Sequence, residues 1–139
     1  MEIDTKRIEL DLHIDNYIPC LLSVTKLIKY REHGNIYHPY KDLTITLEDI
    51  KTIVAETTDV CDSDNVLLWD KKIHIGRIQF FINNPKFLKD IYVQAGKENC
   101  FIEDGNHRFM AACALNIPVI SGWVIGNKQT IERIIKGGK

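Results

Sequence analysis

The sequence predicts an α+β fold in one domain spanning residues 1–139. Segments with strand-like patterns and segments with helical periodicity are mixed along the chain, without the regular strand–helix–strand repeat of α/β proteins. The length of 139 residues and the 45% hydrophobic content suffice for one compact core. No internal repeat or low-complexity tract divides the chain.

Strands are predicted by apolar runs that alternate with polar residues or are bounded by turn residues. RIELDLHI alternates strictly, and Pro19 in YIPCLLSV marks an edge strand or a strand start. The turn sequence AGKEN separates two short apolar runs and predicts a β-hairpin. Strands are therefore expected at residues 7–14, 17–24, 90–94, 100–104 and 118–125, with a short strand or turn at 66–70.

Helices are predicted by apolar residues three and four positions apart. Thr46 and Asp49 have the spacing of a capping box at the start of one helix. Ile75, Ile78 and Ile82 form an apolar stripe on another. Helices are therefore expected at residues 25–34 with Gly34 as the stop, 46–56, 72–84, 106–116 and 128–138. A loop is expected at residues 35–42.

Composition and charge narrow the functional classes. The formal net charge is −1, so any nucleic-acid-binding face has to be local. The charged N-terminus lacks the apolar region of a signal peptide, and no apolar run approaches a membrane span. Four separated cysteines without a C-x-x-C pair favour reduced thiols over a disulfide framework or a zinc knuckle. We therefore expect a cytoplasmic protein.

The most reactive polar cluster is the string DGNHR at residues 104–108, placed between a predicted strand and a predicted helix. The first amides of a helix have no intrahelical partners and carry the positive end of its dipole, so they bind anions. Gly105 permits a close backbone approach or a positive φ. Arg108 offers a planar fork for phosphate oxygens, and His107 can act as a general acid or base. Asp104 can cap the helix, orient His107 or hold a metal.

A purely structural role is the alternative. Aspartate is a common residue at a helix start, Arg108 can pair with a carboxylate, and His107 can be a satisfied surface residue. In either case the apolar run FMAACAL after the cluster is expected to pin the helix against a sheet, because small residues allow close packing.

The string IEDGNHRFMAACALNIPVISGWV, with HIGRIQFFINNP and IYVQ before it, resembles the ParB/sulfiredoxin superfamily. The resemblance covers residues 72–125, with residues 1–15 as an N-terminal strand extension. It implies a small mixed sheet with packed helices and a phosphate-binding loop that opens a helix. It further implies a site for ATP or CTP with Mg²⁺, built on Gly105, Asn106, His107 and Arg108. Sulfiredoxin chemistry is not expected, because Asn106 stands where that reaction needs a cysteine.

The resemblance leaves three functions open. The first is an NTP hydrolase or phosphotransferase that uses residues 104–108. The second is a DNA- or RNA-directed nuclease. The third is a non-enzymatic phage- or plasmid-type protein that binds or inhibits a protein partner. A complete partition protein is not expected, because only about thirty residues follow the motif. His107, Asp104 and Glu103 are the candidate catalytic residues, and Glu32, Asp62 and Asp64 are further candidate carboxylate bases.

Other segments carry weaker functional signals. The acidic run at residues 57–70 contains Asp59, Asp62, Asp64 and Asp70. These carboxylates could coordinate Mg²⁺, although such runs are more often solvated loops. KKIHIGR predicts a basic rim made of Lys71, Lys72, His74 and Arg77. KLIKYREHGNIYHPYK interleaves basic and aromatic residues, a pattern that occurs in nucleic-acid binding but more often on a solvated surface. His33 and His38 lack a third ligand, so no zinc site is proposed there. Trp69 and Trp123 are expected in the core or at an interface.

Overall fold

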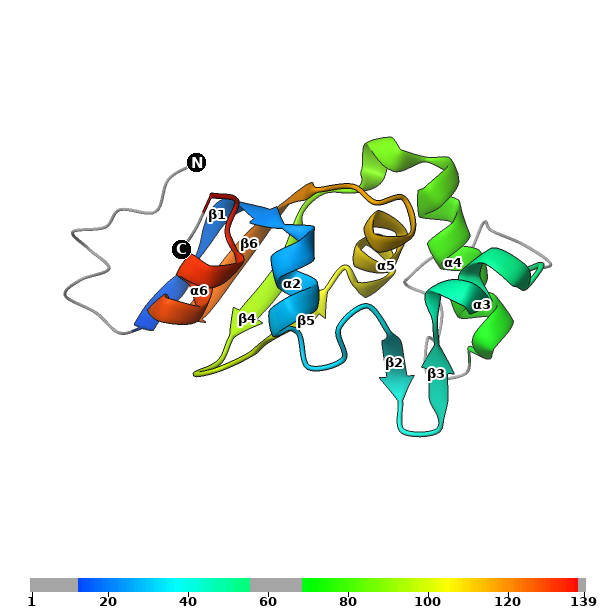
Figure 1. Ribbon diagram of the computed structural model, residues 1–139, viewed down its shortest axis with the longest axis horizontal. Helices are drawn as coiled ribbons and strands as arrows, with labels where there is room; N and C mark the ends of the chain where they lie inside the picture. Colours follow the sequence, from blue (N-terminus) through cyan, green and yellow to red (C-terminus); the bar gives the residue numbers. More distant parts are fainter. Residues whose placement is uncertain (1–12, 56–68, 138–139) are drawn as a thin grey trace.

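The computed structural model describes residues 13–55 and 69–137, which form a mixed α+β fold around a four-stranded sheet (Figure 1). The strand order is β1-β6-β4-β5. β6 is antiparallel to β1 and parallel to β4, and β4 is antiparallel to β5. The strands are β1 (His13–Ser23), β4 (Ile91–Ala95), β5 (Cys100–Asp104) and β6 (Val119–Asn127). The α+β class is therefore confirmed, as are the hairpin β4–β5 and the strand β6.

Figure 1 shows the large sheet on one side of the molecule and a smaller group of elements on the other, with α5 between them. The smaller group holds α3, α4 and a two-stranded sheet of β2 (Tyr37–Tyr40) and β3 (Leu43–Ile45). The helices are α2 (Val24–Tyr30), α3 (Leu47–Thr52), α4 (Lys71–Asn83), α5 (Asn106–Ala114) and α6 (Lys128–Ile134), with a 3-10 turn, η2 (Pro85–Phe87).

Local sequence signals account for several element boundaries. The capping box at the start of α3 is confirmed: the Thr46 amide donates to Asp49 Oδ2 at 3.0 Å, and the Asp49 amide donates to Thr46 Oγ1 at 3.1 Å. Asp70 caps α4 by accepting from the Ile73 amide at 3.0 Å. β1 stands at one end of the strand order and so lies at the sheet edge, as Pro19 predicts.

Three predictions about the first half of the chain are wrong, one of them being the helix expected over residues 46–56, which ends at Thr52. Residues 35–42 were expected to be a loop, but they contain β2, which pairs Tyr37 with Ile45 of β3. Both of these side chains are buried, so core packing overrides the polar and proline residues of the segment. The helix expected to run to Gly34 ends at Tyr30, and Gly34 instead closes the following turn at φ +60°. The strand expected at residues 7–14 lies almost wholly outside the described residues, which contain its last two as part of β1.

The hydrophobic core lies between the large sheet and its helices and continues between α5 and α4. The run after the polar cluster is buried as expected: Phe109, Met110, Ala111 and Ala112 are fully inaccessible. The stripe on α4 is also confirmed, with Ile75 and Ile78 fully buried. Trp69 is buried and Trp123 is half-buried, stacked on Tyr92. The three described cysteines are free and buried: Cys20, Cys100 and Cys113. Among the described residues, no helix has the length and apolar character needed to span a membrane.

Candidate functional site

The turn between β5 and α5 depends on Gly105. This residue is the N-cap of α5 and has a left-handed backbone with φ +93°. It is also buried, and a Cβ placed on it would lie 2.7 Å from Ile91 Cγ2 of the neighbouring strand β4. Only glycine fits this combination of conformation and close packing. The first turn of α5 is therefore held tightly against the sheet.

A cavity of about 200 Å³ opens at this end of α5. Its walls come from the β5–α5 turn, together with one residue of β2 and one of α4. The lining residues are Tyr37, Phe81, Glu103, Asp104, Gly105, Asn106, His107 and Arg108. The structure thus brings residues 103–108 to one cavity. Tyr37 and Phe81 could not be identified from the sequence, because they are distant in the chain and carry no motif.

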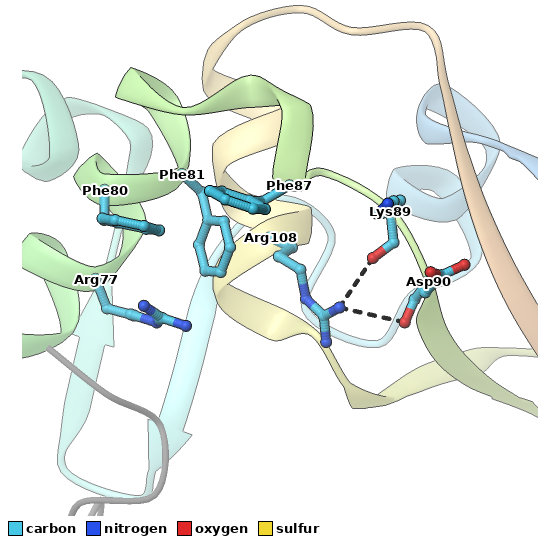
Figure 2. A pocket seen from close by; sticks show the side chains of 7 residues that line it. All are labelled: Arg77, Phe80, Phe81, Phe87, Lys89, Asp90 and Arg108. Atoms are coloured by element: carbon cyan, nitrogen blue, oxygen red, sulfur yellow. Dashed lines mark hydrogen bonds between the residues drawn. The ribbon is translucent and has the colours of Figure 1, made fainter. Parts of the chain in front are cut away.

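Asp104 does not cap α5, because the N-cap position belongs to Gly105, which has no side-chain cap bond. The Asp104 carboxylate is exposed and lies 3.6 Å from Arg108 Nη2. Arg108 Nη1 donates to the carbonyl oxygens of Lys89 at 2.8 Å and Asp90 at 3.3 Å (Figure 2). These bonds fix the guanidinium at the start of β4, so its position is set before any ligand binds.

Arg108 also lines a second cavity of about 450 Å³. Figure 2 shows aromatic rings along one side of this cavity and Arg108 with the chain at Lys89 and Asp90 along the other. Arg77 lies over the rings of Phe80 and Phe81, at 5.1 and 4.5 Å from their centroids. The lining residues are Arg77, Phe80, Phe81, Phe87, Lys89, Asp90 and Arg108. Phe81 and Arg108 belong to both cavities, which are therefore adjacent.

Asn106 has a structural task that the sequence does not reveal. Its side-chain amide donates to the Ile102 carbonyl at 3.0 Å, and its Oδ1 accepts from Arg31 Nη2 at 3.2 Å. Arg31 is itself buried and donates to the carbonyls of Gly34 at 3.1 Å and Ile36 at 2.8 Å. Burial lowers the pKa of Arg31, partly offset by nearby groups. The pair ties the segment before β2 to the start of α5.

His107 is buried beside Tyr37 and His74. Its Nε2 lies 3.2 Å from Tyr37 Oη and 3.1 Å from His74 Nδ1, and His74 Nδ1 lies 3.5 Å from the same oxygen. His74 was expected on a basic rim, but it is fully buried and faces His107, so that prediction is wrong for His74. Burial lowers the pKa of His74, against a raising effect from Asp70, and so favours its neutral form. Trp69 packs against both imidazole rings.

The remaining members of the expected basic rim are also separated from one another by their contacts. Lys71 forms an ion pair with Asp49 at 2.9 Å, whereas Lys72 is exposed and Arg77 faces the aromatic cavity. Asp70 is committed to capping α4.

The candidate carboxylates lie in different places. Glu103 is exposed at the mouth of the smaller cavity and accepts a hydrogen bond from the Tyr17 hydroxyl. This hydrogen bond is the largest of the effects that raise the pKa of the Tyr17 hydroxyl. Glu32 lines a third cavity of about 310 Å³ together with His33 and His38, and this cavity shares Tyr37 and Asn106 with the smaller cavity. Three further candidates fall outside the described residues: Asp59, Asp62 and Asp64.

His33 and His38 lie with their ring centroids 4.5 Å apart. In residues 13–55 and 69–137, no three His, Cys, Asp or Glu side chains form a group able to hold a metal ion. Comparisons of the chain with protein-family models, with curated proteins and with solved structures find no match.

Proposed function

We propose that this chain is a ParB/sulfiredoxin-like domain that binds a nucleoside triphosphate at residues 104–108 and hydrolyses it or transfers its γ-phosphate. The observation that carries the proposal is the pair of adjacent cavities that share Phe81 and Arg108. One lies at the N-terminal end of a nine-residue helix, and the other has aromatic walls. Together they have the two chemistries that a nucleotide requires.

The smaller cavity suits the phosphates. The amides of the first turn of α5 point toward this end of the helix, where the helix dipole favours negative charge. Arg108 lies at the junction of the two cavities, held in place by the Lys89 and Asp90 carbonyls. Its remaining donors supply the charge-assisted hydrogen bonds that phosphate oxygens accept most strongly. Because a preorganised donor costs little entropy on binding, this fixed position favours affinity.

The larger cavity suits the base and ribose. Phe80 and Phe87 are stacked with their ring centroids 6.0 Å apart and an interplanar angle of 12°. Phe87 is 42% exposed, so one side of the pair is accessible to a planar ligand. Stacking of a base on an aromatic ring contributes about 1–3 kcal/mol. The nucleotide therefore lies with its base near η2 and its phosphates at the start of α5.

Catalysis at this site would rest mainly on positioning and charge neutralisation, as in other phosphoryl transfers. His107 lines the phosphate cavity from its buried side and would polarise or protonate a phosphate oxygen. Glu103 and Asp104 are exposed at its mouth. There they would activate the attacking water or acceptor, or help to hold the Mg²⁺ that neutralises the triphosphate.

The test is calorimetric titration with ATP, CTP and GTP, each with and without Mg²⁺, combined with an assay for released phosphate. Arg108→Lys keeps the charge and loses the fork, so it should weaken binding by about tenfold or more. Arg133→Lys is the matched control, because Arg133 lies over Tyr30, in the α6–α2 contact rather than in either cavity. If wild type binds none of the three nucleotides, or Arg108→Lys binds as wild type does, the proposal fails.

The same preparation separates the alternative functions. Binding of short DNA that weakens steeply with salt, together with strand cleavage lost in His107→Gln, would favour a nuclease. Full biological activity of a His107→Gln, Arg108→Lys double variant would favour a non-enzymatic protein that binds a macromolecular partner.

A further inference from the structure

Three buried polar atoms converge at the inner wall of the smaller cavity. His74 Nδ1 and His107 Nε2 are 3.1 Å apart, and Tyr37 Oη lies 3.2 Å from His107 Nε2 and 3.5 Å from His74 Nδ1. The exposed fractions of the three residues are 6% for Tyr37, 0% for His74 and 9% for His107. We call them the His–His–Tyr cluster. They come from β2, α4 and α5, so the whole tertiary fold is needed to assemble them.

Hydrogen bonds among the three atoms cannot occupy all three edges of the triangle at once. Each ring nitrogen is either a donor or an acceptor, never both, and a nitrogen acceptor has a single lone pair. If the Tyr37 hydroxyl donates to one nitrogen and accepts from the other, the nitrogen–nitrogen edge has no hydrogen bond. If instead one nitrogen donates to the other across their 3.1 Å edge, the single lone pair of the acceptor is used and the hydroxyl donates to neither nitrogen. In both cases at least one edge lacks a hydrogen bond, whereas an ion can bind all three atoms.

The triangle has the dimensions of one face of a metal coordination shell. Nitrogen and oxygen ligands lie about 2.0–2.2 Å from Zn²⁺, so two ligands of a tetrahedral site are separated by about 3.3–3.6 Å. The three edges of the cluster are 3.1, 3.2 and 3.5 Å, so one lies in that range and the other two lie just below it. Small side-chain movements would therefore let one ion contact all three atoms.

The surroundings of His74 are consistent with a functional role. Its second nitrogen, Nε2, is buried and has no hydrogen-bond partner among the described residues. Leaving a buried polar group unpaired costs about 1–3 kcal/mol, which an apolar side chain at this place would avoid. Nε2 therefore adds no hydrogen bond to the fold among the described residues. Burial also favours the neutral form, which is the form that binds a metal ion.

We propose that Tyr37, His74 and His107 bind one divalent transition-metal ion of the zinc class. Two imidazole nitrogens favour Zn²⁺, Co²⁺ or Cu²⁺ over Mg²⁺, which prefers oxygen ligands. On binding, the Tyr37 phenol releases its proton to solvent and becomes a phenolate ligand, as groups bound to a cation do. Tyr37 and His107 line the smaller cavity, so a fourth ligand, a water or an anion oxygen, would reach the ion from that side.

The experiment uses the full chain after removal of metal by chelation. It is titrated with Zn²⁺ by calorimetry and with Co²⁺ by visible absorption, both without nucleotide. One ion should bind per chain, with the strong visible bands of tetrahedral Co²⁺. His107→Gln and His74→Gln should abolish these bands. Tyr37→Phe, which keeps the ring and removes only the hydroxyl, should weaken Zn²⁺ binding by more than about tenfold, the least that loss of a coordination partner costs.

The control is the His33→Gln, His38→Gln double variant, which removes the exposed histidine pair and should bind both ions as wild type does. The proposal is overturned if wild type binds neither ion, if the control loses binding, or if Tyr37→Phe binds Zn²⁺ with wild-type affinity. Circular dichroism checks that each variant is folded. If a histidine variant does not fold, the Zn²⁺ affinity of Tyr37→Phe tests the proposal instead. Failure of nucleotide binding would leave this result unaffected, because no nucleotide is present in the titration.

Discussion

Replacing Gly105 with alanine adds one methyl group at the point where the candidate phosphate loop packs on the sheet. The added Cβ would lie 2.7 Å from Ile91 Cγ2 and 3.0 Å from Ile91 Cβ. Contacts below 3.0 Å are essentially never formed by a real Cβ, so one of the two segments has to move. Ile91 is fully buried in the internal strand β4 and has little freedom to do so.

Two costs add together in this variant. An alanine in the left-handed region at φ +93° costs about 1–2 kcal/mol. Overpacking against a buried side chain costs roughly 1–3 kcal/mol more. Gly105→Ala should therefore lower the free energy of unfolding by about 2–5 kcal/mol. Urea unfolding followed by the fluorescence of the two tryptophans measures this value, with linear extrapolation to water.

Gly137→Ala separates the two costs. Gly137 also has a positive φ, +74°, but nothing lies within 4 Å of the position of an added Cβ. Gly137→Ala should therefore lower the free energy of unfolding only by the conformational cost, about 1–2 kcal/mol. Ile91→Ala in the Gly105→Ala background should restore part of the lost stability relative to the sum of the single variants. If Gly105→Ala costs no more than Gly137→Ala, close packing against β4 does not constrain the turn and the reasoning is refuted.

Three further predictions concern other parts of the structure. Hydrogen bonding from the Thr46 amide, aided by Lys71, lowers the pKa of Asp49. The stability that the Asp49 carboxylate contributes is therefore fully present above the unfolded pKa of about 3.9, and it is lost as the pH falls through the lower folded pKa. Asp49→Asn should thus be about 1 kcal/mol less stable than wild type in urea unfolding at pH 7, with the difference vanishing near pH 2; a pH-independent difference would contradict this. Arg31→Met leaves buried carbonyls without donors and should cost about 2–4 kcal/mol in the same assay, and a loss under 1 kcal/mol would show that solvent replaces the guanidinium. Burial raises the pKa of the Cys20 and Cys100 thiols to about 11 and that of the Cys113 thiol to about 12. In a Cys61→Ser variant at pH 8, these three thiols should therefore react with a thiol reagent far more slowly in the native protein than in the urea-unfolded chain. Equal rates would contradict their buried positions.

Local sequence signals predicted the second half of the chain well. The helix over residues 72–84, the hairpin, the helix after the DGNHR string and the following strand all occur close to the expected bounds. These elements have strong periodicity and clear stops, such as Asn116, which has φ +56° just after α5. The site residues 103–108 share one cavity for the same reason, because they are consecutive and span one turn.

Long-range contacts could not be predicted in this way. Periodicity correctly predicted a helix around His74, but not that this side chain would be buried against His107, 33 residues later in the chain. Tyr37 belongs to a strand that the polar segment around it concealed, and its partner His107 is 70 residues away. The Arg108 contacts with the Lys89 and Asp90 carbonyls depend on how α5 lies against the start of β4. Such pairings are decided by tertiary packing, which a single sequence pattern does not encode.

The small sheet β2–β3 has a consequence for backbone dynamics. A two-stranded hairpin is marginally stable in water by itself, so β2 and β3 depend on what their buried side chains contact. The Tyr37 hydroxyl connects β2 to α4 and α5 through the two histidines. An ion or ligand that holds these groups together would also suppress local opening of the hairpin. Amide hydrogen exchange in β2 and β3 should then slow on binding, so that a surface hairpin reports the occupancy of a buried cluster.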